Sequence, residues 1–340
     1  MFKLNLLSTI HTDIVLSHEL VRHKMAAEMI HKRDDNEDNR WKTDLQTIIK
    51  NELRVLIIGK SGHGKSETGN TLLRKRVFDS GLSPNPLTTT FRFGTKEINN
   101  RNIVIVDGPG LFFDSGFTEV NMKKELAKAT ALLAPGPNVF ILIVGLNKFD
   151  ESEIRAIDMY KNAFGEELMK YLIVVFTRGD ELIRNGLLIK DYVNKFEEGP
   201  VKTFLADCDD RYTSINNIAT ADIKDTEANR ILEMIFALEI KNGGQIYQNA
   251  EFIKAEKEVE NRIKEMVNKS TESLTHEDIL ALRASVRSEI VEEASWFKTM
   301  IGSFIVGFGT AIAFYLSGPG AVVGGMALVT RIAKSFPKRL

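Results

Sequence analysis

The residues of this chain best suited to hold a phosphorylated ligand lie in a glycine-rich stretch at 59–66. This stretch reads GKSGHGKS and fits the pattern G-x-x-x-x-G-K-[ST]. Glycines in such a loop let backbone N–H groups surround phosphate oxygens, and the N-terminus of the following helix adds partial positive charge. Lys65 is expected to neutralise the β- and γ-phosphates of a nucleotide, and Ser66 to ligate Mg²⁺. The candidate ligand-binding residues here are Gly59, Ser61, Gly62, His63, Gly64, Lys65, Ser66 and Glu67.

A second phosphate-facing element is predicted at DGPG, residues 107–110, directly after the apolar run NIVIV. Asp107 is expected to reach Mg²⁺ through water, and the N–H of Gly110 to meet the γ-phosphate. Between the two elements, NPLTTTFRFG at 85–94 offers threonines that could bind Mg²⁺ and the γ-phosphate in the triphosphate state only. On composition the candidates are Thr88, Thr89 and Thr90.

A nucleobase site is predicted at TRGD, residues 177–180, where the apolar run LIVVF ends. A carboxylate at Asp180 can accept hydrogen bonds from N1 and N2 of guanine, and adenine has neither donor. Thr177 would stand where GTPases commonly carry an asparagine, and Arg178 would lay its stem over the base. The phosphate loop alone does not distinguish GTP from ATP, so the guanine prediction depends on Asp180.

The elements that must position these residues are short aliphatic runs, each followed by turn residues and a segment of helical spacing. Continuous apolar runs of this kind are typical of parallel strands covered on both faces. The sequence therefore predicts an α/β fold over residues 51–245, with three layers and a mostly parallel sheet. The predicted strands are RVLII (54–58), NIVIV (102–106), VFILIV (139–144) and LIVVF (172–176).

Composition limits the classes of partner. Lys and Arg number 45 and Asp and Glu 46, for a formal net charge of −1, so nothing indicates nucleic-acid binding. Cys208 is the only cysteine, which excludes a disulfide within the chain and fits a reducing compartment such as the cytosol. The polar extension at 1–50 shows no clean secretory signal, so we expect no export.

In their order along the chain, these motifs resemble those of the GIMAP family (GTPases of immunity-associated proteins), within a septin-like and plastid-import-receptor-like group. The resemblance covers about residues 53–240, and the box at 133–153 is particular to that family. It implies a three-layer P-loop GTPase domain that binds GTP or GDP with Mg²⁺. The matching stretches are GKSGHGKSETGNTLL, IVIVDGPGLFFD, LAPGPNVFILIVGLNKFDESE (133–153), FTRGDEL and RYTSINN (211–217).

The resemblance also implies roles for single residues. It makes Thr88 the switch threonine, which ligates Mg²⁺ together with Ser66 and, through water, Asp107. It makes Asn217 the asparagine that supports the base site. In the family a head-to-head dimer forms across the nucleotide, and some members use an arginine of the box for catalysis in trans. Lys148 stands at that position here, and a lysine cannot make the guanidinium fork. The expected catalytic residues are Lys65, Thr88 and Lys148.

Hydrolysis is expected to be slow. Ras-like enzymes orient the attacking water with a glutamine just after D-x-x-G, whereas Leu111, Phe112 and Phe113 follow here. His63 lies inside the phosphate loop and could approach the γ-phosphate, although we favour a solvent-facing position for it. Three functions stay open: a slow GTPase that dimerises with GTP, a catalytically inert GTP-binding scaffold, and a P-loop ATPase.

Two amphipathic helices are predicted in residues 246–297. Apolar residues recur every three or four positions from Phe252 to Met266, and Thr275 to Asp278 resembles a capping box that opens the second helix. We favour packing of these stripes against the α/β domain over an oligomerisation seam, because the pattern is too short for a convincing coiled coil.

Residues 299–330 contain no charged side chain, within a hydrophobic tail at 298–340 that ends in basic residues. A bilayer span needs about 20 apolar residues, so the stretch is long enough to enter a membrane, although SGPG at 317–320 interrupts it. The sequence predicts membrane attachment at the cytosolic face of an intracellular membrane, as a single crossing or as a hairpin. The alternative is a hydrophobic hairpin buried in the protein or in a dimer interface.

Overall fold

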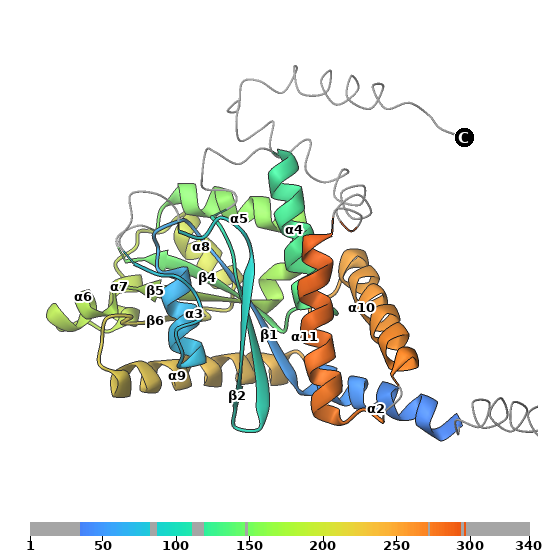
Figure 1. The fold of residues 1–340 in the computed structure, drawn as a ribbon. Coiled ribbons are helices and arrows are strands. Elements are labelled where there is room, and N and C mark those ends of the chain that lie inside the picture. Colours follow the sequence, from blue (N-terminus) through green and yellow to red (C-terminus); the bar gives the residue numbers. More distant parts are fainter. Residues whose placement is uncertain are drawn as a thin grey trace, which may run out of the picture.

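The computed structural model describes residues 35–81, 87–110, 119–146, 149–270, 273–293 and 296. At its centre lies a six-stranded sheet with the order β2-β3-β1-β4-β5-β6 (Figure 1). β2 runs antiparallel to β3, and the other paired strands are parallel. The strands are β1 (Glu52–Ile58), β2 (Arg92–Ile98), β3 (Arg101–Asp107), β4 (Val139–Gly145), β5 (Leu172–Thr177) and β6 (Tyr212–Ser214).

The central strands owe their position to their aliphatic composition. Every residue of β1, β4 and β5 is buried, as expected for strands covered on both faces. Because the four aliphatic runs predicted as strands lie within β1, β3, β4 and β5, that prediction is confirmed. Their parallel arrangement brings the carboxyl ends of four strands, and the loops that follow them, to one edge of the sheet.

Helices cover both faces of the sheet and complete the three predicted layers (Figure 1). On one face, α3 and α9 enclose the smaller hydrophobic cluster with alternate residues of the strands. The larger cluster on the other face includes residues of α2, α4, α5, α8, α10 and α11. The helices are α2 (Asp35–Asn51), α3 (Lys65–Leu73), α4 (Glu119–Leu133), α5 (Glu151–Phe164), α6 (Gly179–Arg184), α7 (Ile189–Val193), α8 (Pro200–Asp207), α9 (Ala221–Lys241), α10 (Ala250–Lys269) and α11 (His276–Glu292), with a 3-10 helix at Glu166–Tyr171.

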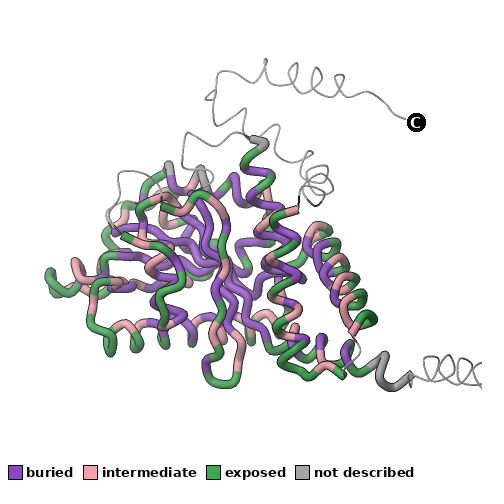
Figure 2. The backbone as a smooth tube through the Cα atoms, viewed as in Figure 1, coloured by how far each residue is buried: buried purple, intermediate pink, exposed green. Residues whose placement is uncertain are grey.

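The two C-terminal helices belong to the same hydrophobic core as the sheet. Phe252, Val259 and Ile263 of α10 are fully buried, and α10 and α11 lie beside α4 (Figures 1 and 2). The Thr275 hydroxyl accepts a hydrogen bond from the N–H of Asp278, and the Asp278 carboxylate accepts one from Thr275 N–H, as in the predicted capping box. The preferred interpretation of the amphipathic stripes, packing against the α/β domain, is therefore confirmed.

A buried group of charged side chains fixes α11 to the start of β1. The Glu52 carboxylate accepts hydrogen bonds from Arg287 at 2.9 and 3.1 Å and from Arg54 at 3.1 Å. Arg283 forms a two-bond pair with Glu256 of α10 at 2.7 and 2.8 Å. Because Arg54, Arg283 and Arg287 are at most 2% exposed, these charges depend on one another rather than on water.

The predicted apolar tail at 298–340 and most of the extension at 1–50 lie outside the described residues. Within the described part of the extension, α2 contributes Trp41, Leu45 and Ile48 to the core. None of the helices in the described ranges is both long and apolar enough to cross a membrane.

Candidate functional site

The glycine-rich loop connects β1 to α3 at the carboxyl edge of the sheet, and its glycines fit the space available. Gly59 has a φ of +134°, and a Cβ there would lie 2.4 Å from the carbonyl oxygen of Ile143. Gly64 has a φ of +91° and immediately precedes α3, which begins at Lys65. Residues that carry a Cβ rarely adopt a backbone conformation with such a positive φ, so glycine is required at both positions for the loop to connect to the helix. The loop thus places the N-terminus of α3 at the centre of the site.

Three oxygen-bearing side chains meet at this helix N-terminus. The Ser66 hydroxyl donates a hydrogen bond of 2.6 Å to Oδ2 of Asp107, and its Oγ lies 3.1 Å from Oγ1 of Thr88. Of the three threonines left open by composition, the structure brings Thr88 to Ser66. Thr89 is exposed, and the Thr90 hydroxyl donates instead to Glu125 at 2.9 Å.

This group of oxygens has the chemistry of a Mg²⁺ site. Asp107 is 1% exposed, and its Oδ1 has no hydrogen-bond partner among the described residues. Burial raises the pKa of Asp107, and the nearby hydroxyl of Ser66 and ammonium of Lys65 offset this only in part. A divalent cation would compensate the buried carboxylate, and hydroxyl and carboxylate oxygens are the ligands that Mg²⁺ prefers. The residues present therefore fit the predicted metal.

The side chains of the loop itself are held by α5. The ammonium of Lys60 lies 3.0 Å from the Glu153 carboxylate, and Nδ1 of His63 lies 3.9 Å from the same oxygen. His63 is only 6% exposed, so the solvent-facing position favoured from the sequence is wrong. The physical reason is that the loop packs against the start of α5, where Glu153 is fully buried and takes both basic side chains. Lys65 Nζ donates to the carbonyl of Lys60 at 2.8 Å.

On the base side, Thr177 braces the phosphate loop. Its hydroxyl donates to the carbonyl oxygen of His63 at 2.8 Å, and its methyl group would lie 3.3 Å from a Cβ at Gly64. Asn217 lies beside the same glycine and is fixed to α3, because its amide donates to Thr68 at 2.9 Å and accepts from Thr71 at 3.2 Å. Thr177 and Asn217, which come from separate segments of the sequence, thus meet at the phosphate loop.

The carboxylate predicted to read the base is placed at the start of α6. Asp180 is partly buried and pairs with Arg184 one turn further along α6. Arg178 is in the left-handed conformation, with a φ of +66°, and its side chain is 50% exposed. The N–H of Gly179 donates to the carbonyl of Ile215 at 2.9 Å, which ties this turn to the segment that carries Asn217.

The remaining predicted residues are placed less centrally. The Glu67 carboxylate is turned away from the loop and interacts with Ser80 at 2.6 Å and Lys224 at 3.0 Å, so only its backbone can take part in the site. Ser61 and Gly62 lie in the loop, and Gly110 is buried. Lys148, together with Leu111, Phe112 and Phe113, lies outside the described residues.

Sequence reasoning missed two acids that organise the site. Glu153 holds Lys60 and His63, and its only signal was the acidic run DESE after the third aliphatic run, VFILIV. Glu125 of α4 accepts hydrogen bonds from the N–H of Phe91 and the hydroxyl of Thr90, both at 2.9 Å. It therefore fixes the chain just after Thr88. Nothing in the local sequence around Glu125 pointed to that contact.

Comparison with known proteins decides the family. A model of the AIG1 family matches residues 53–267, which is more than half of the chain. The chain belongs to the AIG1 family. One relative is GTPase IMAP family member 8 of Mus musculus, 31% identical over 192 residues, or 56% of this chain and 28% of that protein. Another is Immune-associated nucleotide-binding protein 3 of Arabidopsis thaliana, 26% identical over 254 residues, or 74% of this chain and 76% of that protein.

The family resemblance drawn from the motifs is thus confirmed for this AIG1-family chain, which aligns with less than a third of the length of the mouse relative. Among solved structures, Toc33 from Arabidopsis thaliana in complex with GDP and Mg²⁺ superposes with a TM-score of 0.39 at 19% identity. That superposition covers 58% of this chain and 92% of Toc33. Era from Aquifex aeolicus gives a TM-score of 0.37 at 22% identity and covers 54% of this chain and 56% of that one.

Proposed function

We propose that this AIG1-family protein binds GTP with Mg²⁺ at the loop 59–66 and hydrolyses it slowly. The observation that carries the proposal is the meeting of Ser66, Thr88 and Asp107 at the N-terminus of α3. Thr88 lies far from the loop in sequence, and a phosphate-binding loop without a metal has no need of it. Relatives named as GTPases and nucleotide-binding proteins support the same function.

In this function each side chain has a defined part. Backbone N–H groups of the loop and the N-terminus of α3 bind the phosphates. The Lys65 ammonium exchanges its bond to the Lys60 carbonyl for phosphate oxygens. Ser66 and Thr88 would hold Mg²⁺ directly and Asp107 through water. When bound, the metal supplies charge neutralisation at the β- and γ-phosphates.

Slow turnover follows from the residues available to orient water. The side chains of Leu111, Phe112 and Phe113 cannot hold a water molecule, and the imidazole of His63 faces Glu153. Single-turnover hydrolysis at increasing protein concentration tests this function. A slow rate that rises with concentration supports hydrolysis in a dimer. A rate that stays near zero supports the second candidate, an inert GTP-binding scaffold, for which Lys148 in the place of an arginine is the specific reason.

Dimerisation with GTP is part of the same proposal. The family resemblance supports a head-to-head dimer across the nucleotide, and the segment around Thr88 lies beside the metal site, where a γ-phosphate would order it. We expect sedimentation velocity to show a dimer with a non-hydrolysable GTP analogue and a monomer with GDP. A monomer in both states would rule out self-association driven by GTP.

Guanine selection by Asp180 gives a direct prediction. The Asp180→Asn variant is expected to bind GTP about a hundredfold more weakly, because an amide presents a donor to guanine N1 and N2 and loses two charge-assisted hydrogen bonds. The same change should strengthen binding of xanthosine triphosphate, whose base presents a matching carbonyl. Competition against labelled GTP measures both effects. Equal competition by ATP with the unmodified protein would instead favour the ATPase alternative.

Membrane attachment is proposed from the charge-free stretch at 299–330 and the basic residues after it. It would confine the nucleotide-binding domain to the cytosolic face of an intracellular membrane. Flotation of the full chain and of a chain ending at residue 297 with lipid vesicles tests this. We expect only the full chain to float, and equal behaviour of the two would remove the tail from the proposal.

A further inference from the structure

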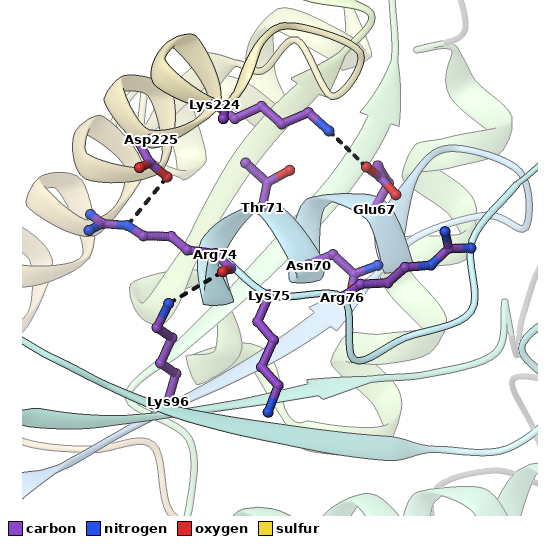
Figure 3. A pocket seen from close by; sticks show the side chains of 10 residues that line it. Glu67, Asn70, Thr71, Arg74, Lys75, Arg76, Lys96, Lys224 and Asp225 are labelled. Atoms are coloured by element: carbon purple, nitrogen blue, oxygen red, sulfur yellow. Dashed lines mark hydrogen bonds and ion pairs between the residues drawn. The ribbon is translucent and has the colours of Figure 1, made fainter.

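A pocket lies along α3, from Glu67 in the first turn of the helix to the residues that follow its last turn (Figure 3). It has a volume of about 550 Å³, which lies within the range of small-molecule sites. Its walls come from α3 between Glu67 and Thr71, the residues that follow the helix, β2 and the start of α9. The lining residues that carry charge are Glu67, Arg74, Lys75, Arg76, Lys96, Lys224 and Asp225.

The turn that carries Arg74, Lys75 and Arg76 is fixed rather than loose. Asn70 is 7% exposed, and its side chain accepts hydrogen bonds from the N–H of Val77 and of Phe78, both at 2.8 Å. The same side chain donates to the carbonyl of Phe78 at 2.8 Å. These bonds fix the backbone that carries the three basic residues before any ligand arrives, which lowers the entropic cost of binding.

The backbone at Arg74 is unusual for an arginine. It ends α3 in the left-handed conformation, with a φ of +48°, where glycine or asparagine is the common choice. α9 holds the guanidinium, since Arg74 donates to Asn229 and lies 3.7 Å from Asp225. The side chain is therefore aimed along the pocket wall (Figure 3). Residues other than glycine in the left-handed conformation are strained, and such strained residues cluster at binding sites.

Close packing against the edge strand completes the fixed geometry. A Cβ on Gly94 of β2 would lie 2.8 Å from side-chain atoms of both Leu73 and Val77. Because glycine stands there, the turn lies directly on β2 and places Lys96 beside it. Lys96 Nζ donates to the carbonyl of Arg74 at 3.3 Å.

The pocket holds more positive charge than its surroundings neutralise. Glu67 pairs with Lys224 and Asp225 lies near Arg74. Lys75 and Arg76 are exposed, and their side chains have no hydrogen bond or ion pair within the part of the chain that the structure describes. The C-terminus of a helix contributes about half a negative charge, which is too little to balance the remaining cations. Guanidinium and ammonium groups gathered in one pocket match phosphate oxygens in charge and geometry.

We propose that this pocket is a second anion site, which takes a compact ligand carrying two or more phosphate groups, either free or as the headgroup of a lipid. Arg74 and Lys96 lie side by side in its wall, and the side chains of Lys75 and Arg76 are exposed at its rim. The nucleotide site is separate, because neither Lys65 nor the three residues of the Mg²⁺ site, Ser66, Thr88 and Asp107, line this pocket. The ligand can therefore bind while the phosphate loop is filled.

The test uses the full chain saturated with GDP and Mg²⁺, so that the phosphate loop is blocked, at physiological ionic strength. Inositol trisphosphate is titrated calorimetrically into the unmodified protein and into the double variant Lys75→Gln, Arg76→Gln. Loss of two cationic contacts is expected to raise the dissociation constant about tenfold or more. A matched control, Lys190→Gln with Lys195→Gln, removes two exposed cations from another surface and should leave it unchanged.

Vesicles distinguish the two sources of the ligand. Cosedimentation is measured with and without phosphatidylinositol bisphosphate, and the double variant is compared with its control. Binding of soluble inositol trisphosphate alone assigns a free ligand. Binding to the vesicles through Lys75 and Arg76 assigns a lipid headgroup. No binding in either arm, or equal weakening in the control variant, overturns the second anion site without touching the proposed GTP function, because GDP occupies that site throughout.

Discussion

Replacing Ser66 by alanine is expected to remove the Mg²⁺ dependence of nucleotide binding. The Ser66 hydroxyl already lies between Asp107 and Thr88, at 2.6 and 3.1 Å, which is where the metal would gain its protein ligand. In the unmodified protein, chelation of Mg²⁺ should weaken binding of fluorescent GDP and GTP analogues. In the Ser66→Ala variant, the affinity for the GDP and GTP analogues in the presence of Mg²⁺ should fall by at least about a hundredfold. It should then equal the affinity that the unmodified protein shows with the chelator.

A substitution of Thr88 distinguishes its part in the metal site from that of Ser66. A threonine that reaches the metal only in the triphosphate state should matter for GTP and not for GDP. Thr88→Ala is therefore expected to weaken the GTP analogue while leaving the GDP analogue unchanged. Thr89→Ala is the matched control, because Thr89 is an exposed neighbour on the same segment. If the two threonine variants behaved alike, or if Thr88→Ala weakened GDP equally, Thr88 would have no part in the metal site.

The phosphate and metal side of the site was accessible from the sequence because its signals are local. A glycine-rich loop must lie between a strand and a helix, and D-x-x-G at a strand end faces the same edge of the sheet. The strands β1, β3, β4 and β5 were predictable too, because the signal for each is a continuous aliphatic run within the strand itself. Choosing Thr88 from its neighbours was a matter of family resemblance, since composition left all three threonines open. The hydrogen bond of Thr90 to Glu125 shows that threonines close together in the sequence contact different parts of the structure.

Side-chain direction and long-range pairing were not accessible. The sequence around His63 predicts an ordinary loop residue. Its burial depends on the position of α5 beside the loop, and no local sequence pattern specifies that position. β2 was not predicted as a strand because it is at the sheet edge and partly exposed, without the apolar run of a central strand. Arg283 and Arg287 sit among apolar residues of α11 and would be taken for solvent-facing positions. Their burial becomes intelligible only once Glu52 and Glu256 are placed beside them.

The buried carboxylate of Glu52 predicts the largest stability effect in the molecule. Glu52→Gln is expected to lower the free energy of unfolding by about 3–5 kcal/mol, because it leaves the guanidinium groups of Arg54 and Arg287 buried without their counter-charge. Urea unfolding of the full chain measures the change. The control is Asp79→Asn, which removes one carboxylate from an exposed pair with Arg92 and should cost less than about 1 kcal/mol. If both variants lost a similar free energy of unfolding, the buried charged cluster would contribute no more to stability than an exposed ion pair.

The pH dependence of this difference follows from the pKa of Glu52. Burial raises the pKa, but Arg287, Arg283 and Arg54 outweigh it and lower the value from 4.5 to about 2. A carboxylate with a lowered pKa in the folded state stabilises above its unfolded value and loses this contribution as the pH falls from 4.5 towards 2. Such a lowering corresponds to about 3 kcal/mol. The stability gap between the unmodified protein and Glu52→Gln should therefore be full at neutral pH and clearly smaller at about pH 3. At that pH Glu52 is protonated in the unfolded state but still largely ionised in the folded state, so proton binding favours unfolding of the unmodified protein and not of the variant. A gap of constant size across this range would show that Glu52 acts through its shape and not through its charge.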